Sequence, residues 1–85
     1  TNPAFIQSYT LVNFRGDLLA IAPAGIQRDA FTENRDTAYA LRAQLDDAFI
    51  TPIEAGPTGR STLAFVARVS DENGVPVGAL IVRYS

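Results

Sequence analysis

The sequence predicts an α+β domain built on one antiparallel sheet, and three observations lead to this fold class. Two β-rich runs, residues 63–69 and 75–84, flank an Asn-Gly turn, the strongest short-range signal of a β-hairpin. A second pair of β-rich runs lies in the first quarter of the chain. Between the two pairs, apolar residues recur with the period of an amphipathic helix. Hairpins around one helix are typical of a sheet that carries the helix on one face.

The first hairpin is predicted between residues 8 and 22. Residues 8–15 mix β-branched, aromatic and polar side chains, and residues 18–22 are an apolar run. Gly16-Asp17 lies between the two runs, and both residue types are common in tight turns. These residues therefore predict two short antiparallel strands.

A loop is predicted after the first hairpin. Pro23 and Gly25 break the β pattern, and a polar stretch of about ten residues follows as far as Asn34. Ile26 and Phe31 are large apolar side chains within this stretch. We expect both to point inward and anchor the loop.

The helix is predicted between Arg35 and Phe49. One face carries its apolar side chains, and most of the charged ones lie off that face. The apolar set is Ala38, Leu41, Leu45, Ala48 and Phe49. Asn34 or Asp36 is the expected N-cap, and Pro52 is expected to end the helix. Residues 51–59 are rich in proline and glycine and predict either a loop or a short irregular edge strand.

The predicted order is therefore β-β-α-(β)-β-β in a single domain, residues 1–85. Because the chain has no initiator methionine and stops directly after a strand-like run, we expect it to be a fragment of a larger protein. No run of residues is long and apolar enough to span a bilayer, so we expect no direct membrane contact within these residues.

The composition excludes most enzyme mechanisms. Histidine and cysteine are absent, which removes imidazole and thiolate metal sites, disulfides and the common nucleophile–histidine pairs. The net charge is −2 and the arginines are scattered, so no electrostatic footprint for nucleic acid is predicted. We expect no catalysis, no metal and no cofactor.

Short motifs in the chain are interpreted as structural. Arg15-Gly16-Asp17 spells a cell-adhesion tripeptide but fits a hairpin turn. Residues 56–61 lack the spacing, lysine and following helix of a phosphate loop, and residues 71–74 have their glycine too early for a calcium loop. The acidic pairs Asp46-Asp47 and Asp29/Glu33 are expected to be solvated.

The chain resembles the Cache and related extracytoplasmic PAS-like sensor domains. The resemblance rests on Gly59, the strand 63–69, the turn 71–74 and the Val-Gly strand 77–82, together with the opening pair at residues 12–20. It implies a PAS-like (Cache) antiparallel five-stranded sheet with helix and loop packed on one face. It also implies a homodimer.

The sequence departs from the ligand patterns of two Cache branches. Ala64 and Arg68 stand where the carboxylate-sensing branch has an arginine and a proline, and the chain has no tryptophan for the arginine–tryptophan pair of the amino-acid-binding branch. The resemblance to the family therefore does not identify the ligand.

A ligand pocket is expected between the sheet and the helix–loop region. The candidate ligand-binding residues are Arg35 at the helix start, Tyr39 beside its apolar face, Arg60 entering the penultimate strand and Arg68 within that strand. Arginine can hold a carboxylate with two parallel hydrogen bonds, so a carboxylate-bearing small molecule is the expected partner. Surface ion pairs for the arginines and simple packing for Tyr39 are the alternative interpretation.

The leading hypothesis is an extracytoplasmic small-molecule-sensing domain of a bacterial receptor, such as a histidine kinase, a chemoreceptor or a cyclic-nucleotide enzyme. It would lie on the periplasmic or extracellular side of the inner membrane. The alternative is a cytoplasmic PAS-, GAF- or profilin-like protein-interaction module. A fragment of an enzyme whose active site lies elsewhere is a third option.

Overall fold

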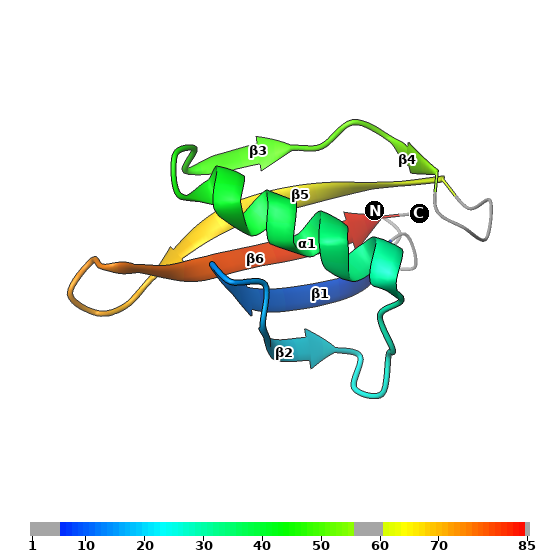
Figure 1. Cartoon of the computed structure of the whole chain (residues 1–85), viewed down its shortest axis with the longest axis horizontal. Coiled ribbons are helices and arrows are strands. Elements are labelled where there is room, and N and C mark those ends of the chain that lie inside the picture. Colours follow the sequence, from blue (N-terminus) through cyan, green and yellow to red (C-terminus); the bar gives the residue numbers. More distant parts are fainter. Residues whose placement is uncertain (1–5, 56–60, 85) are drawn as a thin grey trace.

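One antiparallel sheet covered on one face by one helix makes up the described chain (Figure 1). The computed structural model describes residues 6–55 and 61–84. The strand order is β2-β1-β6-β5-β3, and the short β4 pairs with β5. This confirms the predicted five-stranded PAS-like sheet with the helix on one face. The elements are β1 (Ile6–Asn13), β2 (Leu18–Ala22), α1 (Ala30–Ala43), β3 (Ala48–Ile50), β4 (Glu54–Ala55), β5 (Ser61–Ser70) and β6 (Pro76–Tyr84).

Both predicted hairpins are confirmed, and the same pattern of hydrogen bonds from the backbone to a side chain stabilises their two turns. Asn13 begins the β1–β2 turn, and its side-chain oxygen accepts hydrogen bonds from the backbone N–H groups of Arg15 and Asp17. Asp71 does the same in the β5–β6 turn, for Asn73 and Val75. A polar side chain that satisfies two backbone donors holds a tight turn without help from the rest of the fold.

Helix α1 begins and ends earlier than the sequence predicts. Its N-cap is Asp29, whose carboxylate accepts a hydrogen bond from the backbone N–H of Thr32 at 2.8 Å, and not Asn34 or Asp36. The helix ends at Ala43. Pro52 therefore does not end it, because residues 48–50 already form strand β3 against β5. Pairing with the sheet outweighs the helical spacing of these residues.

The predicted apolar face of the helix was also wrong. The buried helix residues are Asp36, Tyr39, Ala40 and Ala43, which lie on one face at positions i, i+3, i+4 and i+7. In contrast, Ala38 and Leu41 are exposed, and Leu45 is 87% exposed beyond the end of the helix. Ile26 is exposed as well and does not anchor the loop, whereas Phe31 is half-buried.

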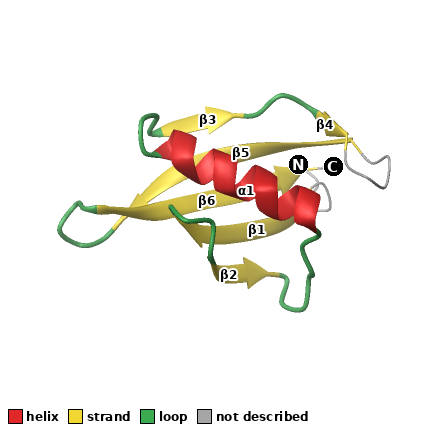
Figure 2. Ribbon diagram, viewed as in Figure 1, coloured by secondary structure: helices red, strands yellow, loops and turns green. Residues whose placement is uncertain are grey.

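The core lies between α1 and the face of the sheet that the helix covers, which we call the front face (Figure 2). The alanines of α1 let the helix lie close to the strands, and Phe49 of β3 packs edge-on against Tyr39. The core residues are Val12, Tyr39, Ala40, Ala43, Phe49, Ala64, Val66, Ala79 and Ile81. Most of these side chains are small, so the apolar core is thin, and polar side chains fill the rest of the helix–sheet interface.

Candidate ligand-binding site

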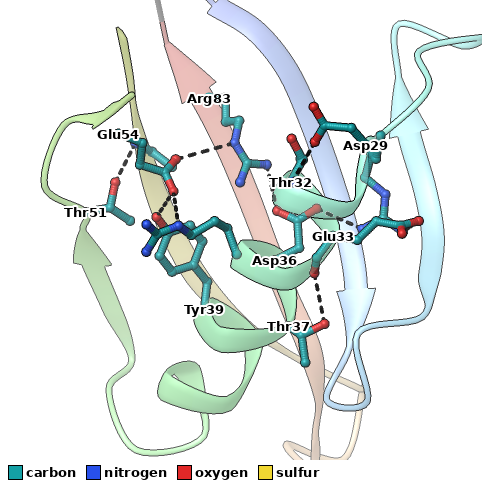
Figure 3. A network of polar contacts seen from close by, with 12 residues as sticks. Asp29, Thr32, Glu33, Asp36, Thr37, Tyr39, Thr51, Glu54 and Arg83 are labelled. Carbon is teal, nitrogen blue, oxygen red and sulfur yellow. Dashed lines mark hydrogen bonds and ion pairs between the residues drawn. The ribbon is translucent and has the colours of Figure 1, made fainter. Parts of the chain in front are cut away.

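A buried carboxylate, Asp36, is the centre of the polar half of the helix–sheet interface (Figure 3). Its side chain is fully buried. Arg28, from the loop before α1, donates a hydrogen bond to Oδ2 at 2.8 Å. Arg83, from the front face of β6, places Nη1 2.7 Å from Oδ1 as an ion pair, without hydrogen-bond alignment. Both arginine side chains are 9% exposed, so a buried charge here is matched by two nearly buried charges of opposite sign.

A second carboxylate, Glu54 of β4, joins the same cluster. It accepts a hydrogen bond from the hydroxyl of Tyr39, and its Oε1 lies 3.8 Å from Nε of Arg83. Arg35 approaches from solvent, with Nε 3.6 Å from Oε2. Arg83 therefore links the two buried carboxylates, one on the helix and one on an edge strand.

The position of Tyr39 shifts its acid–base behaviour. Burial, together with the hydrogen bond and the negative charge of Glu54, raises the pKa of the Tyr39 phenol from 10.0 to about 12. Each of these effects disfavours a second negative charge beside the carboxylate. Tyr39 therefore stays a neutral donor over the physiological range.

A pocket of about 580 Å³ opens beside this cluster, between β1, β2 and the start of the helix. Arg28 and Arg83 line it, so the two arginines that hold Asp36 also face the cavity. Neutral polar side chains make up most of the remaining wall, with two isoleucines. The other lining residues are Gln7, Ser8, Thr10, Ile21, Ile26, Gln27, Asp29 and Thr32.

Among the described residues that line the pocket, Asp29, the N-cap of α1, is the acidic one. Hydrogen bonds from the backbone N–H and then from the side chain of Thr32 lower the pKa of its carboxyl below the ordinary value. Asp29 therefore stays ionised down to acidic pH. The pocket thus presents two cations at its inner side and one fixed anion at the helix start.

The structure separates the four residues that the sequence analysis selected. Arg35 and Tyr39 meet at Glu54, on the β4 side of the helix. Arg68 lies elsewhere, where it binds Asp47 and the carbonyl oxygen of Gln44. Arg60 lies outside the described residues. None of the three described residues lines the 580 Å³ pocket, and their ligand-binding role stays a prediction.

Sequence reasoning missed Arg28, Arg83, Asp36 and Glu54. For Arg83 a signal was present, because Ala79, Ile81 and Arg83 alternate along β6 and the first two are buried. An arginine on the same face must then lie inside as well. Asp36 had no such local signal, since its partners come from another loop and from the last strand.

Residues 6–55 and 61–84 contain neither a cluster of metal-ligating side chains nor a membrane-spanning helix. Within that part of the chain, no three acidic side chains gather closely enough to hold a metal ion. The described helix is too short and too polar to cross a bilayer. Both findings concern the described residues alone.

Comparison with known proteins identifies the fold. The sequence matches no known protein family, and no curated protein matches it. Among solved structures, the chain is similar to the ligand-binding domain of the amino acid chemoreceptor PctC of Pseudomonas aeruginosa PAO1, in complex with GABA. The TM-score is 0.67 at 20% sequence identity, over 98% of this chain and 38% of that one. The chain thus spans well under half of that domain and has the PAS-like (Cache) fold found in a ligand-binding sensor domain.

Proposed function

We propose that this chain is the small-molecule-sensing part of a bacterial signal-transduction receptor, and that it does not catalyse a reaction. The parent protein would be a histidine kinase, a chemoreceptor or a cyclic-nucleotide enzyme, with this domain on the periplasmic or extracellular side of the inner membrane. The observation that carries the proposal is the pocket of about 580 Å³ lined by two nearly buried arginines. The likeness to a chemoreceptor ligand-binding domain supports it.

The pocket favours a ligand with a carboxylate. Arg28 and Arg83 both reach the pocket wall and carry more N–H donors than Asp36 can accept. A carboxylate that enters can take up these donors with charge-assisted hydrogen bonds. Because both arginine side chains are only 9% exposed, such bonds are stronger here than at the surface.

Asp29 gives the ligand a second requirement. It is ionised and lies at the helix start, on the same pocket wall as Arg28. A cationic group on the ligand would meet it there. We therefore propose a small molecule with a carboxylate and an amine, and GABA, the compound in the complex of the similar domain, has both.

Ligand binding would change the contact between helix α1 and the last strand, β6. Asp36 holds Arg28 of the loop and Arg83 of β6. A ligand carboxylate competes with Asp36 for both arginines, so it changes the strength of the contact between α1 and β6. A ligand that binds one arrangement better than the other shifts the population between them.

The proposal is tested by thermal unfolding of the chain with a panel of carboxylic acids, amines, amino acids and GABA. A ligand at a hundredfold excess over its Kd stabilises by about 2.7 kcal/mol, which raises Tm by about 10 °C or more in a chain of this size. The informative variant is Ile21→Trp, which fills the pocket from edge strand β2 and leaves the ion pairs intact. Leu45→Trp, on an exposed side chain away from the pocket, is the matched control.

We expect Ile21→Trp to lose the shift and Leu45→Trp to keep it. A shift that survives in Ile21→Trp would place the ligand elsewhere, and alanine variants of Arg35, Tyr39, Arg60 and Arg68 would then test the sites predicted from the sequence. No shift from any compound, with folding intact, would favour the protein-interaction module instead. The homodimer that the resemblance implies is also part of the proposal.

A further inference from the structure

Arg83 lies between the pocket and a second polar group outside the pocket wall. It lines the pocket of about 580 Å³, whereas Glu54 and Tyr39, which donates its hydroxyl to Glu54, do not. Nε of Arg83 is 3.8 Å from Oε1 of Glu54, and Nη1 is 2.7 Å from Oδ1 of Asp36. Figure 3 shows Glu54 on one side of Arg83 and Asp29, which lines the pocket, on the other. One nearly buried guanidinium therefore connects the pocket with two residues outside its wall.

The two carboxylates hold Arg83 with unequal strength. The ion pair with Asp36 is short, and Asp36 is fully buried, so loss of a cation beside it is costly. The distance of 3.8 Å to Glu54 is too long for a hydrogen bond. Glu54 also has two other partners, the hydroxyl of Tyr39 and, at 3.6 Å, Nε of Arg35. When a ligand carboxylate binds Arg83, Glu54 is therefore the protein carboxylate that releases it first.

From this inequality we propose that Glu54 is a positioning residue of the pocket, which acts on the ligand through Arg83. The inference rests on the proposed function and adds a residue that sets the affinity for carboxylates. In the free chain, the charge of Glu54 attracts Arg83 and competes with a ligand carboxylate for it. Ligand binding breaks this contact and leaves Glu54 with Tyr39 and Arg35. Occupancy of the pocket therefore changes the hydrogen bond between Tyr39 and Glu54.

Titration calorimetry of Glu54→Gln tests the competition. The variant removes the charge and keeps the length of the side chain and one acceptor oxygen. The probes are GABA, butyrate, which lacks the amine, and butylamine, which lacks the carboxylate. We expect Glu54→Gln to lower the Kd of GABA and butyrate at least ~5-fold, because the competitor for Arg83 is gone. Butylamine should not bind more tightly.

Glu33→Gln is the matched control. Glu33 lies 3.9 Å from Arg28, the other arginine of the pocket, but its side chain is 56% exposed. Water screens a charge at such a position, so the same substitution should leave the Kd of each probe within about twofold. A merely structural role of Glu54 would weaken all probes alike, and a gain limited to the probes with a carboxylate distinguishes the positioning role from it.

Tyrosine fluorescence gives a second readout that does not require a Glu54 variant to fold. The chain has three tyrosines and no tryptophan, so Tyr9→Phe combined with Tyr84→Phe leaves Tyr39 as the sole emitter. A phenol that donates a hydrogen bond to a carboxylate emits less light. Glu54 accepts this bond more strongly once Arg83 has left it, so saturating butyrate should lower the emission of Tyr39. Butylamine should leave the emission unchanged.

The outcomes separate this inference from the proposed function. If the wild type binds neither GABA nor butyrate, the proposed ligand class and the role of Glu54 are both overturned. If it binds them and Glu54→Gln behaves like Glu33→Gln, or tightens butylamine as well, only the role of Glu54 is overturned. Emission of Tyr39 that stays constant at saturating butyrate has the same meaning, because the ligand then binds without changing the contact with Glu54.

Discussion

The two faces of the sheet show the reverse of the usual arrangement, because the buried face carries charged side chains and the exposed face carries apolar ones. The front face, covered by α1, buries charged side chains, with Arg83 beside Asp36 and Glu54. The opposite face, which we call the back face, exposes Tyr9, Phe65 and Ile50, and the described strand residues that share it are uncharged. Charges usually lie outside a domain and large apolar patches inside it. Each face therefore departs from the usual arrangement, and each departure has its own cause.

On the front face, the buried charges are tolerated because they are matched. Two carboxylates, Asp36 and Glu54, face two nearly buried arginines, Arg28 and Arg83. Such a cluster seldom stabilises more than apolar packing would, but loss of one member is costly. Arg28 and Arg83 of this cluster line the pocket, where the proposed function has them bind the ligand. On the back face, the described residues leave Tyr9, Phe65 and Ile50 partly exposed.

The largest expected effect follows from breaking the buried cluster. Asp36→Ala leaves Arg28 and Arg83 facing each other without their shared carboxylate, and we expect a loss of about 3–5 kcal/mol in the free energy of unfolding. Urea denaturation measures it. Asp46→Ala removes an exposed carboxylate that pairs with Arg42, and it should cost less than ~1 kcal/mol.

Equal losses in these two aspartate variants would mean that the front-face charges are no more important than surface pairs. If Asp36→Ala does not fold, Asp36→Asn keeps the shape of the side chain and gives a smaller loss that can be measured. The loss in the free energy of unfolding measured for Asp36→Asn then serves for the comparison of the two faces.

Tyr39→Phe tests the next largest contribution. The variant removes the hydroxyl that donates to Glu54 and leaves this buried carboxylate with fewer donors, for an expected loss of about 1–3 kcal/mol at neutral pH. The phenol pKa is raised from 10.0 to about 12 in the folded chain. A raised pKa stabilises the fold below the unfolded value, and this stability is lost as the pH rises through the folded value.

The difference in unfolding free energy between the wild type and Tyr39→Phe should therefore be constant below pH 10 and shrink as the pH rises toward 12. Denaturation curves at several alkaline pH values measure it. Tyr9→Phe removes a half-exposed hydroxyl on the back face and is the control, with an expected loss of less than ~0.5 kcal/mol at neutral pH. A constant difference up to pH 12 would contradict the contact between Tyr39 and Glu54.

The sequence was sufficient for the sheet because the turns are specified locally. Asn13 and Asp71 each bind two backbone donors within four residues, so each hairpin is encoded in one short segment. Alternation then assigns side chains to the two faces. The likeness of hairpin motifs to Cache domains was therefore enough to predict the fold.

The helix and the site needed information that no local pattern contains. Asp36 was predicted only as a possible N-cap, and the apolar spacing placed the buried face on Ala38 and Leu41, whereas the helix buries Asp36. Its burial is possible only because Arg28 and Arg83 come together around it, and Arg83 lies at the far end of the chain. The pocket depends on the same long-range contacts, so its lining was not visible in the spacing of residues.

The smallest expected effect comes from a polar substitution on the back face. Ile50→Thr replaces a 67% exposed side chain on β3 with another β-branched one, so the free energy of unfolding of the dilute chain should change by less than ~0.5 kcal/mol. Val66→Thr makes a matched change on the front face, where the residue is fully buried, and the hydroxyl without a partner should cost about 1–3 kcal/mol. Urea denaturation at low micromolar concentration measures both. If Ile50→Thr instead costs as much as Val66→Thr, the side chain of Ile50 is packed in solution and the two faces do not differ as described.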